Sequence, residues 1–265
     1  MTGESQHVER VAVVDWRHYL HRFHEERSGV LESVLSRTIA GDHTPYRWLA
    51  RAVSATGGRV LDLACGSGAM TRELERDGRT VYGLDLSAGE LGIAASRHPG
   101  PWLRGDALRL PIADGSLDAV TSCMGLVVVT PLDTLIGEIA RVLKPGGVLA
   151  AIAPAVRPLG PRDLRTLTPL TTRLRTRPQF PGPVELTSFA ETLTKHSLRK
   201  VEDARQRYHF TVTSRADAEL LLSALYLPTT RRSRIEAVIE YLERRIARTG
   251  PVDIAIPMRR LVAIK

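Results

Sequence analysis

The stretch 59-RVLDLACGSGAMTREL-74 decides the fold of this chain. Its first part is an apolar, strand-like run that ends at Asp62 and Leu63, and small residues and glycines follow before a helix-like pattern begins. Glycine has no Cβ, so a ligand can approach the backbone of such a turn closely, with free amides and the helix dipole facing it. The stretch therefore predicts a ligand site, although the turn alone does not identify the ligand.

The same alternation of strand and helix continues to Ala153. Strand-like runs at "TVYGLDL", "LDAVTSC" and "GVLAAIA" alternate with helix-like segments at Gly68–Asp77, Ser87–Arg97 and Pro131–Leu143. The second helix opens with Ser87 and Glu90, which form an S-x-x-E capping box. Strands that alternate with helices of this length predict a parallel sheet, and right-handed crossovers place helices on both of its faces.

The remaining segments predict helices around this core and two more strands. Residues 15–54 are typical of two or three helices, and 154–185 of a proline-rich insertion with one short helix. A helix around 184–198, a strand over 200–212 and two helices over 215–227 and 231–248 follow. The last segment, 252–265, predicts a final strand in which Pro257 indicates a bulge or an edge position.

Composition limits the class of protein. Hydrophobic residues make up 43% of the chain and charged residues 25%, which is typical of a globular protein. Cys65 and Cys123 are the only cysteines, so no disulfide framework and no metal site is expected. Neither a membrane span nor a secretion signal is visible, which favours a cytoplasmic protein.

The net charge of +8 has two interpretations. It indicates either a nucleic-acid or other acidic partner, or only an arginine-rich composition, because four of the 37 basic residues are lysines. The arginines are scattered, without a block of like charges, which favours the compositional interpretation.

Three carboxylates narrow the ligand to a nucleoside. The turn reads A-x-G-x-G at Ala64–Gly68, so it is neither a dinucleotide fingerprint nor a phosphate loop. Asp85 ends the second strand, where an acid accepts hydrogen bonds from the hydroxyls of a ribose. Asp106 follows the third strand and is suited to an adenine amine. With Asp62, these acids mark the carboxyl ends of successive strands, where ligands of open sheets bind.

From Arg59 to Ala153 the chain resembles the class I S-adenosylmethionine-dependent methyltransferases, particularly the type 11 group. The motifs that carry the resemblance are "VLDLACGSG", "VYGLDLS", "GDALRLPIADGSLDAV" and "LKPGGVL". It implies an α/β, Rossmann-like, mostly parallel sheet of seven strands with strand 7 antiparallel, helices on both faces, and S-adenosyl-L-methionine as cofactor. By the same resemblance the cofactor-binding residues are Asp62, Ala64, Gly66, Ser67, Gly68, Asp85, Leu86, Asp106, Ala107 and Cys123.

The resemblance also implies a domain organisation. Residues 1–55 are expected to form an N-terminal helical cap, and 56–265 the methyltransferase domain. Within that domain, 154–185 and 213–250 are expected as insertions over the acceptor site.

Methyl transfer needs alignment and exclusion of water, and a base only if the acceptor loses a proton. The N-terminal segment "DWRHYLHRFHEER" is the candidate lid, with Tyr19, Phe23 and His24 toward the pocket. His18, His21 and His24 recur every three residues, which is more typical of a partly solvated helix face than of a metal site. His24 is the candidate base because it is next to Phe23 and is therefore expected to be partly buried. Cys65 is expected to fill a small apolar space within the turn.

The expected reaction is transfer of a methyl group to a small molecule in bacterial secondary metabolism, such as antibiotic biosynthesis. One alternative is an rRNA or tRNA methyltransferase, although an aromatic content of 5% leaves few side chains on which RNA bases could stack. Another is a methyltransferase fold with non-methylating catalysis or with a partner role in a complex. Nucleic acid is therefore not favoured as a partner, no membrane is expected, and a homodimer or a biosynthetic partner protein is left open.

Overall fold

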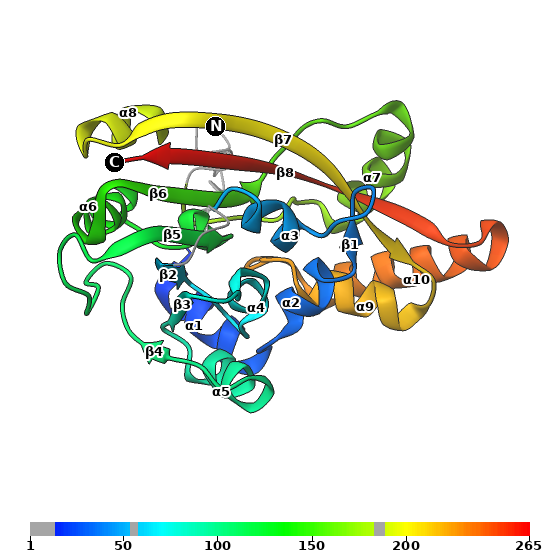
Figure 1. Ribbon diagram of the computed structural model, residues 1–265. Helices are drawn as coiled ribbons and strands as arrows, with labels where there is room; N and C mark the ends of the chain where they lie inside the picture. The colour runs from blue at the N-terminus through cyan, green and yellow to red at the C-terminus, as the bar shows by residue number, and fades with distance from the viewer. Residues whose placement is uncertain (1–13, 54–57, 183–188) are drawn as a thin grey trace, which may run out of the picture.

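The computed structural model describes residues 14–53, 58–182 and 189–265, and its centre is one mixed sheet of eight strands (Figure 1). The strand order is β1-β7-β8-β6-β5-β2-β3-β4. The strands are β1 Thr38–Ile39, β2 Gly58–Leu63, β3 Arg79–Asp85, β4 Trp102–Arg104, β5 Leu117–Cys123, β6 Leu143–Pro154, β7 Arg199–Val212 and β8 Val252–Ile264.

The sheet is parallel on one side and antiparallel on the other. Parallel pairs join β2 to β3 and β5, β3 to β4, and β5 to β6, while β8 is antiparallel to both β6 and β7. The sequence predicted seven strands with an antiparallel last one. The additional strand is β1, two residues that pair antiparallel with the outer edge of β7. Two residues are too few to show the alternation of apolar and polar side chains that predicts a strand, so β1 could not be predicted from the sequence.

Helices cover both faces of the sheet, as the crossover rule requires. They are α1 Trp16–Glu26, α2 Val30–Leu35, α3 Pro45–Ala50, α4 Ala69–Leu74, α5 Ala88–Arg97, α6 Leu132–Val142, α7 Pro161–Leu174, α8 Phe189–Lys195, α9 Arg215–Ser223 and α10 Arg232–Thr249, with a short 3-10 helix η1 at Gly125–Val127. The expected helix over 184–198 begins among residues 183–188, outside the described residues, and α8 is its described part.

Alternate strand residues supply the cores of the two faces. Leu61 packs in one cluster with α6 and α8, and its neighbour Val60 packs in the other with α3 and α4. Both side chains are almost fully buried. The sheet is therefore a rigid platform, and the turns after β2, β3 and β5 project from its carboxyl edge.

A third apolar cluster lies beyond the central sheet, in a region that we call the distal lobe. It consists of α7, α9, α10 and the outer halves of the long strands β7 and β8, which run past the rest of the sheet (Figure 1). Phe210 and Val212 of β7 and Val252 and Ile254 of β8 pack there against Leu221, Leu222, Val238 and Leu242 of the helices. The segments predicted as insertions therefore share a core with the ends of two strands.

Of two local predictions, one is confirmed and one is wrong. Pro257 is at an edge position as predicted, because β8 pairs only with β7 at this residue, and no register shift marks a bulge there. It immediately precedes Met258, where pairing with β6 ends, so a residue without an N–H is tolerated there. The helix predicted over Gly68–Asp77 ends at Leu74, before Gly78. Among the described residues, no helix is both long and apolar enough to span a bilayer.

Candidate functional site

The glycine-rich turn joins β2 to α4 through three residues in the left-handed region. Their φ angles are 55° at Ala64, 52° at Gly66 and 86° at Gly68. At Gly68 an added Cβ would lie 2.7 Å from the Trp102 ring, so this glycine allows close packing against another side chain. The open approach for a ligand is at Gly66, where the nearest atom to such a Cβ is a carboxylate oxygen of Glu90, 3.7 Å away.

Asp62 is fully buried at the end of β2. Its Oδ2 accepts a hydrogen bond of 2.7 Å from the Thr71 hydroxyl, while its buried Oδ1 has no hydrogen-bond partner within the described part of the chain. Burial, with a smaller contribution from Asp85, raises the pKa of Asp62 from an ordinary 3.8 to about 7. A buried carboxylate oxygen without a partner suits a cation such as the ammonium group of an amino acid.

Asp85 ends β3 next to the turn. One oxygen accepts from the Gly66 amide at 2.8 Å and the other from the Ser87 amide at 2.9 Å. These two bonds fix the carboxylate across the mouth of the turn and leave lone pairs for further donors, such as ribose hydroxyls. Burial is the main cause that raises the pKa of Asp85, and Glu90 raises it further while His24 lowers it.

The side expected to hold adenine follows β3 and β4. Leu86 is 56% exposed, which leaves an apolar surface directly after Asp85. Asp106 is exposed and uses one oxygen to accept from the Leu108 amide at 2.9 Å, while Ala107 is buried. The sequence thus placed these residues on neighbouring strand ends, as the structure has them.

The turn after β5 packs directly against the glycine-rich turn. A Cβ added to Gly125 would lie 2.9 Å from the Ala64 Cβ, and Met124 is in the left-handed region. Cys123 is partly buried, and burial raises the pKa of its thiol. Burial likewise raises the pKa of the Cys65 thiol well above its usual value, in keeping with a small apolar filler.

The segment with α1 and α2 is fastened over this edge by carboxylates. Glu25 accepts from the Ser87 hydroxyl at 2.9 Å and from the Ala88 amide at 3.0 Å. Glu32 accepts from the Ser67 hydroxyl at 2.5 Å and pairs with Arg72. The Ser67 hydroxyl is therefore engaged by α2, and its carbonyl accepts from Arg72 at 3.1 Å, so its backbone N–H is the group left for a ligand on this side.

Aromatic side chains from three distant parts of the chain form a second layer above the edge. Tyr226, which follows α9, lies 4.6 Å from the Phe23 ring and 5.6 Å from the Phe180 ring, centroid to centroid. Gly182, close to Phe180, donates to the Val127 carbonyl at 3.0 Å, which connects this layer to the end of β5. We call Tyr19, Phe23, Phe180 and Tyr226 the aromatic roof.

The three histidines of α1 differ in placement. His18 and His21 are exposed, whereas His24 is turned inward and hydrogen-bonds to Glu90 and Tyr226. Among the described residues, no three His, Cys, Asp or Glu side chains gather as metal ligands. Sequence reasoning missed Glu90, Glu32 and Tyr226. Glu90 had been assigned to a capping box, and nothing in the sequence around Tyr226 relates it to α1.

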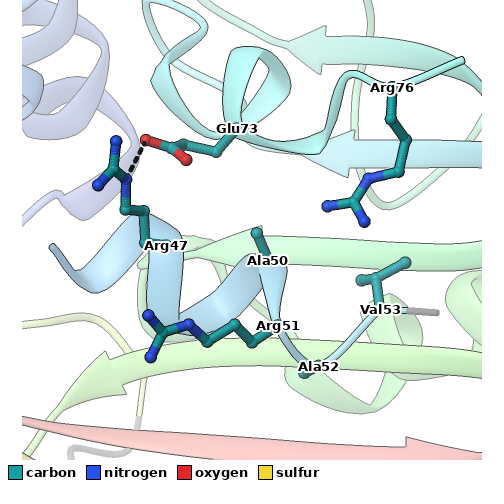
Figure 2. A pocket seen from close by; sticks show the side chains of 7 residues that line it. All are labelled: Arg47, Ala50, Arg51, Ala52, Val53, Glu73 and Arg76. Atoms are coloured by element: carbon teal, nitrogen blue, oxygen red, sulfur yellow. Dashed lines mark ion pairs between the residues drawn. The ribbon is translucent and has the colours of Figure 1, made fainter. Parts of the chain in front are cut away.

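A cavity of about 530 Å³ lies elsewhere, between α3 and the carboxyl-terminal end of α4 (Figure 2). Arg47, Arg51 and Arg76 line it, and Arg47 pairs with Glu73 at 3.5 Å. The glycine-rich turn is at the opposite, amino-terminal end of α4, so this cavity is separate from that turn.

Similarity to known proteins agrees with this geometry. Residues 61–151 match the methyltransferase-domain family. A demethylmenaquinone methyltransferase of Beutenbergia cavernae is 40% identical over 131 residues, which are 46% of this chain and 55% of that protein. The chain spans about half the length of the curated relatives it matches.

Solved structures share the fold. The YcgJ protein of Bacillus subtilis has a TM-score of 0.58 at 19% identity, over 82% of this chain and 96% of that one. The [4+2]-cyclase SpnF has a TM-score of 0.54 at 22% identity, over 83% and 79%. At these identities the likeness shows the fold alone.

The parallel sheet with its antiparallel last strand, its glycine-rich turn and its strand-end carboxylates define a Rossmann-like nucleoside-binding domain. Together with the family match, they agree with the predicted resemblance to the class I S-adenosylmethionine-dependent methyltransferases, and residues 61–151 belong to the methyltransferase-domain family. The methyltransferase domain and the cofactor that the sequence predicted are confirmed for these residues.

Proposed function

We propose that this protein transfers a methyl group from S-adenosylmethionine to a small molecule held under the aromatic roof. The observation that carries the proposal is the buried, unpartnered Oδ1 of Asp62 beside the glycine-rich turn. The ammonium group of the cofactor supplies the missing donor, so the residues present fit this group.

The cofactor-binding roles follow the strand ends. Ala64, Gly66, Ser67 and Gly68 would line the amino-acid portion through their backbone, with Asp62 on its ammonium. Asp85 would accept from the ribose hydroxyls, Leu86 would pack on the adenine, Asp106 and Ala107 would meet the adenine edge, and Cys123 would lie near the sulfonium. When bound, S-adenosylmethionine supplies a methyl carbon activated by the positive sulfur.

The roof favours a flat, largely uncharged acceptor. Phe23, Phe180 and Tyr226 pack on one another, and such rings would stack well on a flat group that lies against them. Quinol-like rings fit this description, and the curated relatives include enzymes named for demethylmenaquinone. An aromatic metabolite of bacterial secondary metabolism, including antibiotic biosynthesis, fits equally, and His24 is the proposed proton acceptor in either case.

The test combines binding with transfer. Titration with S-adenosylhomocysteine should give a saturable heat, and radiolabelled S-adenosylmethionine should label members of a panel of quinols, phenols and carboxylic acids. Binding without labelling of any small acceptor would contradict the proposal of a small-molecule substrate, and absence of binding would contradict the site.

The charge distribution supports an RNA methyltransferase as a second candidate. Segments 157–177 and 231–248 together hold 12 basic and 4 acidic residues, which leaves 25 of each kind in the rest of the chain. The net charge of +8 therefore lies in α7, α10 and their flanks, which pack together in the distal lobe. Arg162, Arg165, Arg231 and Arg232 are exposed and form no ion pair among the described residues.

RNA binding through this lobe would release counterions. The logarithm of the affinity for tRNA should then fall steeply with the logarithm of salt concentration, and the fourfold serine variant of Arg162, Arg165, Arg231 and Arg232 should flatten the slope by about 3. The matched control replaces the arginines of the Figure 2 cavity, Arg47, Arg51 and Arg76, and should leave the slope almost unchanged. Equal effects of both variants would reject the second candidate.

A methyltransferase fold with other chemistry, or with a role in a complex, remains the third alternative. Its support is a likeness in fold to a protein named as a [4+2]-cyclase. Retention of S-adenosylmethionine without consumption by any acceptor would favour this alternative over both others.

A further inference from the structure

Three polar side chains from distant parts of the chain form a continuous hydrogen-bonded array. His24 of α1 lies with Nδ1 3.1 Å from Oε1 of Glu90 in α5, and with Nε2 2.9 Å from the hydroxyl of Tyr226. Glu90 and Tyr226 are buried, and His24 is partly buried. The array thus joins the lid, the helix after β3 and the segment after α9.

Glu90 is directed into this array instead of capping its own helix. The Ser87 hydroxyl accepts from the Glu90 amide at 3.2 Å, but the Ser87 amide donates to Asp85 and not to Glu90, so the predicted capping box is only half formed. The free end of the Glu90 side chain accepts from His24 and, at 3.0 Å, from the Gly29 amide. A buried carboxylate with these two donors is held in one position.

The Glu90 carboxylate determines which atom donates and which accepts in each hydrogen bond of the array. A carboxylate only accepts hydrogen bonds, so Nδ1 of a neutral His24 carries the hydrogen and Nε2 carries the lone pair. The Tyr226 hydroxyl must then donate to Nε2. Its oxygen keeps acceptor capacity, and no donor among the described residues uses it.

The Tyr226 hydroxyl is buried beneath α1, next to the carboxylate of Glu90. Burial raises the pKa of its phenol well above the ordinary value, with smaller contributions from Glu90, Tyr19 and Asp85, so the phenol stays neutral. Asp85 is thus a near neighbour of the array, and the Gln179 amide donates to the Tyr226 carbonyl at 3.0 Å beside Phe180. The hydroxyl therefore belongs to the roof between the ends of β3 and β5.

We infer that Glu90, His24 and Tyr226 form a proton relay and that the methyl acceptor reacts through an acidic hydroxyl or enol. This inference rests on the proposed function and defines its substrate class. The acceptor's proton passes to the Tyr226 oxygen as the Tyr226 proton passes to Nε2 of His24. The electron pair left on the acceptor forms the bond to the methyl carbon, the carbon–sulfur pair stays on sulfur, and the positive charge ends on His24 beside Glu90.

The roles differ between the three residues. Tyr226 is the catalytic residue because it touches the acceptor, His24 stores the proton, and Glu90 is a positioning residue that sets the tautomer. Charged groups that face His24 from the packed elements are Glu90 of α5 and Asp85 at the end of β3.

The turnover test uses 1,4-dihydroxynaphthalene as the acceptor probe and thiophenol, which is already ionised near neutral pH, as the comparison. Tyr226→Phe and His24→Gln should lower kcat with the naphthalenediol by about 100-fold or more. The Kd for S-adenosylhomocysteine should stay within about threefold, and thiophenol turnover should change much less. Matched controls are Tyr241→Phe in α10 and His18→Gln on the exposed face of α1.

A second readout needs neither acceptor nor cofactor. Nitrogen-15 spectra of the wild type should show His24 protonated at Nδ1 and unprotonated at Nε2, and Glu90→Gln should give a mixture of tautomers. The opposite tautomer in the wild type, equal losses with both probes, or no methylation of the naphthalenediol would overturn the inference. Failure of the wild type to bind S-adenosylhomocysteine would instead overturn the proposed function.

Discussion

At the scale of single residues, the site depends on where carboxylates are buried. Asp62, Asp85 and Asp106 could be predicted from the sequence because each follows an apolar run of strand type, and parallel strands end at a common edge. The protonation of Asp62 could not be predicted, because it depends on the complete burial of that side chain by the packed fold.

Asp62 should couple cofactor binding to proton release. With a pKa of about 7, it is mostly protonated at pH 6 in the free protein, and an ammonium group against Oδ1 favours the carboxylate. Calorimetry at pH 6 in buffers of different ionisation enthalpy should therefore detect release of most of one proton, and at pH 8.5 almost none. Asp62→Asn should abolish the release, and a wild type without any buffer dependence at pH 6 would contradict this assignment.

The same raised pKa has a consequence for the stability of the free protein. Between about pH 4 and pH 7 the folded state keeps a proton on Asp62 that the unfolded chain has lost. The contribution of this proton to the free energy of unfolding is therefore fully present below pH 4 and is lost as the pH rises through 7.

Gly68 and Gly92 form a matched pair for a stability test. Gly68→Ala places a Cβ at a φ of 86° and 2.7 Å from Trp102, so we expect a loss of about 2 kcal/mol or more in the free energy of unfolding. Gly92 lies inside α5 with nothing within 4 Å of an added Cβ, so Gly92→Ala should stabilise by about 0.5–1 kcal/mol. Urea denaturation measures both, and equal effects would refute the explanation from packing.

At the scale of elements, periodicity predicted most of the helices and strands, and their partners were harder to predict. The alternation from Arg59 to Ala153 predicted the parallel strands and the helices between them. It could not show that β8 lies between β6 and β7, or that Glu90 leaves its capping box for α1. Both depend on contacts between segments that are far apart in the sequence.

The segment with α1 should open independently of the sheet. Phe23 is 4% exposed and packs on Tyr226, so Phe23→Ala removes an apolar contact between α1 and the segment after α9. We expect a loss of about 2 kcal/mol confined to this segment, seen as roughly 30-fold faster amide exchange in α1. Exchange in β5 and β6 should not change, and His18→Ala is the exposed control. Equal acceleration throughout the sheet would show that α1 is part of the global folding unit.

At the scale of the whole molecule, the buried carboxylates and the excess of basic residues lie in different regions. Carboxylates and the aromatic roof lie at the carboxyl edge of the sheet, while the excess positive charge lies in the distal lobe. The sequence showed the charge but not its concentration, because two segments more than 50 residues apart come together only through the packing of α7 on α10. The aromatic roof was equally hidden, since it combines Tyr19 and Phe23 with Phe180 and Tyr226.

The most direct test of the account is calorimetric titration of the wild type and of Asp85→Ala with S-adenosylhomocysteine. Loss of charge-assisted hydrogen bonds to the ribose should weaken binding by about 1.5–3 kcal/mol, which is roughly 10-fold to 150-fold in Kd. A wild type that gives no binding heat, or a variant that binds as tightly as the wild type, would contradict the claim that strand-end carboxylates hold the nucleoside.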